Sequence, residues 1–249
     1  AAVIQRAKLN PNWFPTVVQS GAAVGKVTNK AVPGSDGNWQ RVRKRLAGAT
    51  VVAGLGDNHA TGVGCGLEED DFQTVVVSAG TSGTINRVSP PNVPLAGNAA
   101  CFEYYRNRLL LMMLADCCKW YDRFVAQAAP KYRERLDALN ELILQADPAR
   151  LRRVLHASGK EDNSLDCEDL TVGEQAASTQ YSIMTELLLL VKAMQAEVVE
   201  GDTPPDRFVL TGGLSQSTFF QQLFHTGVKL LAPAAKVLVS ARKGPLRYQ

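Results

Sequence analysis

One acidic residue beside a glycine turn is the part of this sequence best suited to chemistry on a phosphate. The turn contains Gly54 and Gly56, follows the apolar run at 51–53 and leads directly to Asp57. Glycine accepts positive φ and has no Cβ, so the backbone can turn sharply there and approach a ligand closely. Asp57 could cap the small-residue segment at 58–67 or take a proton from a bound hydroxyl. Residue type alone favours the cap, whereas the flanking glycines favour a catalytic base.

Two further glycine turns offer groups that could bind a nucleotide. The turn at 80–83, with the sequence Gly-Thr-Ser-Gly, lies between β-branched runs at 74–78 and 84–88. Its backbone N–H groups and two hydroxyls suit an anion. The turn at 211–213 follows the short strand predicted at 207–210. A single glycine turn after a strand is usually an ordinary loop, but together these turns could line one cleft.

Length and charge limit the class of protein. A chain of 249 residues with 45% hydrophobic content can bury a full core, and we expect one domain with appendages. The formal charge of +3 is too small to indicate nucleic acid or an anionic membrane as partner. The basic run at 41–45 has no interleaved aromatic residues, so we expect a solvated loop there.

Cysteine usage favours a cytoplasmic protein. The 5 cysteines include no CxxC pair and no histidine at ligand spacing, which argues against a disulfide scaffold and a zinc site. No apolar run is long enough to span a membrane, and the N-terminus lacks the features of a signal peptide. The first residue is Ala1, and the ends of the sequence are typical of a piece of a longer polypeptide.

Two common nucleotide motifs are not supported. The run Gly-Val-Gly-Cys-Gly at 62–66 is superficially like a dinucleotide fingerprint, but no parallel βαβ unit with a ribose-binding acid accompanies it. The sequence has no P-loop. His59 could shuttle protons beside Asp57, although a packed or surface histidine is the more common explanation.

Periodicity and capping signals predict alternating strands and helices. Helices are expected at 114–128, as an amphipathic pair within 130–156, at 172–200 and at 216–231, and further strands at 99–105 and 236–240. Residues 108–113 could form a strand or begin the helix that follows. Thr171 and Glu174 have capping-box spacing, and the middle of the helix they open should be deeply buried. The acidic segment at 158–169 is predicted to be a solvated loop, although its carboxylates could imitate a metal site.

The order of these motifs resembles the C-terminal half of the FGGY carbohydrate kinases. The matching segments lie at 51–58, 62–66, 78–83 and 208–217. The Gly-Asp-Asn sequence is most similar to that of xylulokinases and related pentulose kinases. Residues 13–27 are similar to the segment that joins the two domains of this family. The resemblance covers most of 10–125 and 172–240.

This resemblance implies a ribonuclease H-like, actin-like ATPase domain, an α/β fold with a mixed sheet flanked by helices. Residues 1–49 would be the lead-in between domains and residues 50–249 the C-terminal ATPase-type domain. The family's N-terminal sugar-binding domain, its Gly-Glu-Arg loop and its closing helix are not recognisable in these residues. We therefore expect the fragment alone to be inactive.

The resemblance also implies ATP-dependent phosphorylation of a sugar hydroxyl, in a ketopentose such as xylulose, with ATP and Mg²⁺ as cofactors. Asp57 would be the general base and would bind the substrate together with Asn58. Residues that match ATP-binding positions of the family are Gly80, Thr81 and Ser82 at the phosphates and Gly212, Gly213 and Ser217 at the adenosine. No residue of this chain is expected to hold the metal.

Two alternatives remain open from the sequence. One is a non-catalytic, nucleotide-binding actin-like module, and the other is an FGGY kinase for a different polyol or sugar acid. The expected partner is a small-molecule sugar, without nucleic acid or membrane, and the oligomeric state is open, with a homodimer as one alternative.

Overall fold

The computed structural model describes residues 6–13, 16, 18–30, 36–152, 169–197 and 204–240. The chain divides into two compact units, residues 1–57 and residues 58–249, here termed the N-terminal and C-terminal units.

The N-terminal unit contains a two-stranded antiparallel sheet and one α-helix. Strand β1 (Ala23–Lys26) pairs with β2 (Thr50–Val52), and η1 (Pro11–Trp13) is a single 3₁₀ turn. The basic run at 41–45 lies in helix α2 (Gly37–Leu46), so the predicted loop is wrong. The Asp36 carboxylate accepts a hydrogen bond from the Trp39 N–H at 2.8 Å, and the basic side chains occupy the last turn, where the helix dipole favours them.

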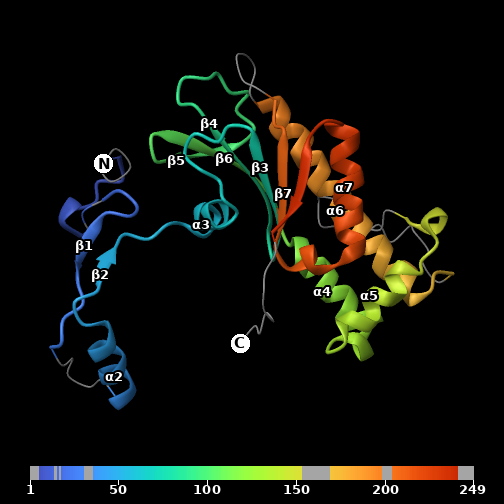
Figure 1. The fold of residues 1–249 in the computed structure, drawn as a ribbon, viewed down its shortest axis with the longest axis horizontal. Helices are drawn as coiled ribbons and strands as arrows, with labels where there is room; N and C mark the ends of the chain where they lie inside the picture. The colour runs from blue at the N-terminus through green and yellow to red at the C-terminus, as the bar shows by residue number, and fades with distance from the viewer. Residues whose placement is uncertain are drawn as a thin grey trace. The chain divides into compact units, whose positions relative to one another are not determined.

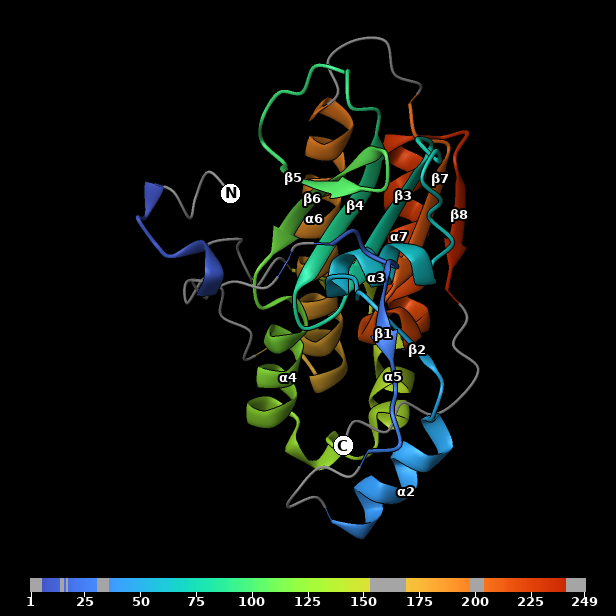
Figure 2. The same cartoon turned by 90° about the vertical axis from the view of Figure 1, so that its left-hand side faces the viewer.

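A mixed six-stranded sheet forms the centre of the C-terminal unit. Its strands lie in the order β5-β6-β4-β3-β7-β8, which Figure 2 shows side by side. Their bounds are β3 (Thr74–Ala79), β4 (Gly83–Ser89), β5 (Ala100–Tyr104), β6 (Asn107–Leu114), β7 (Arg207–Thr211) and β8 (Lys236–Val239). Strands β3, β7 and β8 run parallel, and the other pairs are antiparallel. Residues 108–113 therefore belong to a strand, because β6 is hydrogen-bonded between β4 and β5.

Helices lie on both faces of this sheet, which confirms the predicted α/β class (Figure 1). They are α3 (Asp57–Gly64), α4 (Cys117–Ala128), α5 (Leu136–Leu144), α6 (Val172–Glu197) and α7 (Thr218–Leu231), with 3₁₀ turns η2 (Pro130–Tyr132), η3 (Pro148–Arg150) and η4 (Gly213–Gln216). Alternate residues of β3 serve the two faces. Val75 and Val77 belong to the larger core, and Val76 belongs to the smaller core on the opposite face.

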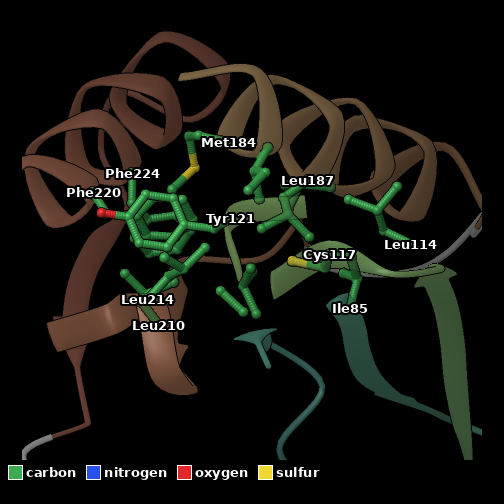
Figure 3. Close-up of a cluster of buried hydrophobic side chains, with 14 of the residues drawn as sticks. Ile85, Leu114, Cys117, Tyr121, Met184, Leu187, Leu210, Leu214, Phe220 and Phe224 are labelled. Carbon is green, nitrogen blue, oxygen red and sulfur yellow. The ribbon is translucent and has the colours of Figure 1, made fainter. Parts of the chain in front are cut away.

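The larger core lies where α4, α6 and α7 meet the sheet. Tyr121 from α4, Met184 from α6 and Phe220 from α7 converge there, together with Leu214 of η4 (Figure 3). These buried side chains fix the helices, and with them the loops at the ends of the strands, to a rigid support.

One helix prediction needs correction. The expected pair within 130–156 consists of the single α-helix α5 followed by the 3₁₀ turn η3 among the described residues, because the Asp147 carboxylate caps the Ala149 N–H at 2.9 Å and closes only one turn. The middle of helix α6 is largely buried, as predicted, with Ile183, Leu187 and Val191 at 0% exposure, although Leu189 is 50% exposed. The predicted acidic loop lies outside the described residues except for Asp169.

The capping box at the start of α6 is confirmed. The Thr171 N–H donates to the Glu174 carboxylate at 2.8 Å, and the Glu174 N–H donates to the Thr171 hydroxyl at 3.3 Å. We expect Thr171→Ala to lower the free energy of unfolding by about 1 kcal/mol, because one N–H at the helix start loses its acceptor. Thr171→Ser keeps the hydroxyl and should stay near wild type. Urea unfolding of both variants measures the difference, and equal midpoints would show that the cap contributes nothing.

Candidate functional site

Two of the predicted glycine turns begin side by side at one edge of the sheet. Strands β3 and β7 are parallel neighbours, and Ser78 pairs with Thr211 at their carboxyl ends. The turn at 80–82 follows β3, and the turn at 212–213 follows β7. Loops at the carboxyl ends of parallel strands commonly line ligand sites, and the turns after β3 and β7 lie at such a place.

Gly212 brings these two turns into direct backbone contact. Its φ is +96°, in a region that residues with a side chain rarely adopt. A Cβ at this position would lie 2.5 Å from the carbonyl carbon and oxygen of Ala79 and 2.8 Å from the Gly80 nitrogen. Only glycine therefore allows the two turns to approach this closely.

A cavity of about 510 Å³ lies beside this contact, within the C-terminal unit. Its volume is in the range of small-molecule sites. Its lining comes from the two turns and from α4, α5, α6 and η4, through Gly80, Thr81, Cys118, Tyr121, Asp122, Leu136, Asn140, Gln180, Gly213, Leu214, Gln216 and Ser217. Four of the six predicted ATP-binding residues are in this lining, while Ser82 and Gly212 belong to the same turns but do not line the cavity.

The first turn of α4 fixes the turn after β3. The Cys118 N–H donates to the Gly80 carbonyl at 3.0 Å, and its Sγ donates to the Ala79 carbonyl at 3.0 Å. Ahead of this helix, Asp116 forms ion pairs with Lys119 at 2.6 Å and Arg123 at 3.2 Å. The hydrogen bond from Lys119 is the main reason that the pKa of Asp116 is lowered.

Ser217 joins the turn after β7 to helix α6. Its Oγ accepts a hydrogen bond from the Phe220 N–H at 3.4 Å and so caps α7. The same hydroxyl donates to Oε1 of Gln180 at 2.9 Å. Sequence reasoning found Ser217 but missed Gln180, which lies on a helix face whose spacing indicates only core.

Tyr121 and Asn140 were also missed, although both line the cavity. Burial raises the pKa of Tyr121 to about 12, against a lowering contribution from Gln180, so the phenol is neutral at physiological pH. The sequence carried no specific signal for either residue, because Tyr121 fits the apolar periodicity of its helix and Asn140 resembles an ordinary surface asparagine.

Asp57 and Asn58 lie where α3 begins, at the division between the two units. Asp57 is the first residue of that helix, as its predicted position after a glycine turn requires. Its assignment as a base, and the assignment of Asn58 as a substrate ligand, stay predictions. His59 is packed within the C-terminal unit, with Nε2 3.1 Å from the Glu103 carbonyl and its ring 5.7 Å from that of Phe102. This supports the packed histidine rather than a proton shuttle.

The described residues show neither a metal-ligand cluster nor a membrane-spanning helix. No group of three or more His, Cys, Asp or Glu side chains within the described ranges could hold a metal ion. Among the helices that the structure describes, none has both the length and the apolar content needed to cross a bilayer.

Comparison with known proteins shows similarity to a curated kinase. No family model matches the chain. The xylulose kinase of Streptomyces coelicolor is 28% identical over 245 residues, which cover 96% of this chain and 47% of that protein. The chain thus spans about half the length of the curated relative it matches.

Solved structures of sugar kinases have a fold similar to that of this chain. Xylulose kinase from Rhodospirillum rubrum superimposes with a TM-score of 0.68 at 15% identity, covering 96% of this chain and 48% of that one. The chain resembles the C-terminal half of the FGGY carbohydrate kinases. Plasmodium falciparum glycerol kinase with ADP has a TM-score of 0.66 at 10% identity over 96% of this chain and 47% of its own. The C-terminal unit thus has the actin-like ATPase fold, with its mixed sheet flanked by helices.

Proposed function

We propose that the protein to which this chain belongs is an ATP-dependent sugar kinase that phosphorylates a hydroxyl of a ketopentose such as xylulose. The observation that carries the proposal is the cavity of about 510 Å³ beside the joined turns after β3 and β7. The relatives named xylulose kinase support the substrate class, and the glycerol kinase solved with ADP supports the nucleotide.

In this proposal each turn binds a different part of the nucleotide. Gly80, Thr81 and Ser82 offer backbone N–H groups and hydroxyls to the phosphates. A second group, Gly212, Gly213 and Ser217, lies against the adenosine. Fixed donors around the transferred phosphoryl group would supply most of the rate enhancement, because they require no reorganisation as charge develops.

Asp57 would act on the sugar with Asn58 as a neighbouring substrate ligand. Its carboxylate takes the proton of the attacking hydroxyl, the hydroxyl oxygen forms a bond to the γ-phosphorus, and the bond from that phosphorus to the bridging oxygen of ADP breaks. The products are the sugar phosphate and ADP, and the proton stays with Asp57 until it is released to solvent.

The proposal also covers the domain organisation, the metal, the cellular location and the assembly of the whole protein. Residues 1–49 would be the lead-in from an N-terminal sugar-binding half, and residues 50–249 the ATPase-type half. Mg²⁺ would arrive bound to the ATP phosphates as part of the substrate. We propose a cytoplasmic location because the cysteine usage suits a reducing compartment, and a homodimer as the assembly to be tested.

The test is a phosphorylation screen of the intact protein with ATP and Mg²⁺. Ketopentoses, other polyols and sugar acids are compared by the ADP each produces. Xylulose should give the largest kcat/KM. A higher value for gluconate or glycerol would correct the substrate class. If none of the tested compounds leads to ADP production, a non-catalytic nucleotide-binding module is favoured.

Nucleotide binding in the cavity should protect Cys118 from alkylation. Cys118 lines the cavity, whereas Cys101 is an exposed residue of β5 and is not part of the lining. We expect saturating ADP to slow maleimide labelling of Cys118 roughly tenfold or more, since a bound ligand of this size excludes solvent from most of its contacts. Peptide mass spectrometry reports both sites, and Cys101 is the internal control. Equal slowing at both sites, or at neither, would contradict a nucleotide in this cavity.

A further inference from the structure

Gln180 has a buried hydrogen-bond donor without a partner at the wall of the cavity. The side chain is 0% exposed, and its Nε2 forms no hydrogen bond with any of the described residues. A buried donor left unpaired costs about 1–3 kcal/mol, so such a group in a folded protein calls for an explanation. Because Gln180 also lines the cavity, a ligand there could supply the acceptor.

The contacts of Ser217 decide which end of the Gln180 carboxamide lacks a partner. The Ser217 Oγ already accepts from the Phe220 N–H, which leaves its own proton available to donate. That proton is best received by an oxygen, and Oε1 of Gln180 lies 2.9 Å from the Ser217 Oγ. The network therefore directs the oxygen of the amide to Ser217 and leaves the NH₂ group as the free donor.

The cavity that Gln180 lines has neutral side chains apart from Asp122, and this lining favours a neutral, partly aromatic part of a ligand. Against the burial that raises the pKa of Tyr121, a side-chain interaction with Gln180 lowers it, so the amide faces the phenol, although the geometry of the pair lies outside that of a full hydrogen bond. Leu136 and Leu214 add apolar walls, and Asn140 adds a second carboxamide. The backbone N–H groups suited to phosphate belong instead to the turn that contributes Gly80 and Thr81.

We propose that Nε2 of Gln180 donates a hydrogen bond to the nucleoside part of the bound nucleotide, at an acceptor atom of the base or the ribose. The inference rests on the proposed function, because it assumes that ATP or ADP occupies the cavity. Gln180 is then a specificity-determining residue, and Ser217 is a positioning residue that holds the carboxamide in the donating orientation.

The test compares ligand binding to the intact protein and its variants by calorimetry. Gln180→Met keeps the length of the side chain but removes its donor, and it should weaken ADP binding roughly tenfold, the upper range for one neutral hydrogen bond. Binding of tripolyphosphate, which has no nucleoside, should not change. Gln127→Met, at an exposed position on α4 outside the lining, is the matched control and should bind ADP like wild type.

Gln180→Glu supplies a second readout that a merely structural role would not produce. The carboxylate can still accept from Ser217 but cannot donate to a ligand at neutral pH. Burial raises the pKa of a carboxyl group, and the protonated form regains an O–H donor. ADP affinity relative to wild type at the same pH should therefore be low at neutral pH and rise as the pH falls through that pKa.

The outcomes separate the inference from the proposed function. Wild-type ADP affinity in Gln180→Met, or an equal loss for tripolyphosphate and ADP, would overturn the role of Gln180. If Gln180→Met does not fold, Gln180→Glu provides the test. The role of Gln180 would then be overturned if the ADP affinity of Gln180→Glu, relative to wild type at the same pH, does not change with pH. Wild-type protein that binds neither ADP nor ATP would remove the proposed function itself.

Discussion

Asp57→Asn is expected to lower kcat of the intact protein by roughly 10³-fold, because a positioned general base typically contributes 10²–10⁴-fold to such a step. Asparagine has nearly the same shape as aspartate but cannot accept the proton of the attacking hydroxyl. The expected loss is therefore in turnover, with KM for the sugar changed far less.

The affinity for ADP distinguishes loss of chemistry from loss of structure in this variant. Asp57 is assigned to the acceptor hydroxyl and not to the nucleotide, so ADP binding by calorimetry should stay within about twofold of wild type, less than the loss of one hydrogen bond. Asp137→Asn, at an exposed position in the first turn of α5, removes the same charge elsewhere and should leave kcat unchanged. Wild-type turnover in Asp57→Asn would refute its assignment as the base.

Gly212→Ala should unfold at much lower denaturant concentration and lose nucleotide binding. Its φ of +96° is strained for alanine, and the new Cβ would lie 2.5 Å from the carbonyl carbon and oxygen of Ala79. Strain of 1–3 kcal/mol and overpacking of similar size predict a loss of about 3 kcal/mol or more in unfolding free energy. Since the new Cβ would clash with backbone atoms, relief requires the turns after β3 and β7 to separate.

The adjacent glycine provides the matched control. A Cβ on Gly213 would meet no atom within 4 Å, and its φ is not among the positive values. Gly213→Ala should therefore change the unfolding free energy by less than about 1 kcal/mol, as Gly to Ala does at compatible positions. Guanidinium unfolding of both variants measures the contrast in stability. Similar behaviour of the two would show that close contact between the turns is not needed.

Local features of the sequence predicted much of the fold. The β-branched runs gave β3 and β4, and the spacing of Thr171 and Glu174 gave the start of α6, because such signals act between residues close in the chain. The sequence left the outcome open where local and tertiary forces compete. Residues 108–113 suit either a strand or a helix, and pairing with β4 and β5 decided the outcome.

The candidate site was predicted only in the parts that have a local signal. Glycine turns and the resemblance led to Gly80, Thr81, Gly213 and Ser217, all of which line the cavity. Tyr121, Asn140 and Gln180 line it as well, but each has the residue type and spacing of an ordinary helix position. Whether a helical residue lines a cavity or packs in the core depends on its neighbours from other elements. The sequence of its own helix does not identify those neighbours.

The sequence by itself determined the order of the strands, glycine turns and helices, and it determined that residue 212 can take up a positive φ, because these properties depend on residue type and near neighbours. The tertiary structure decided that two distant turns meet, through the parallel pairing of β3 with β7. It also decided that Ser217 directs the Gln180 amide, because a hydrogen bond between remote residues exists only once packing has brought them within reach.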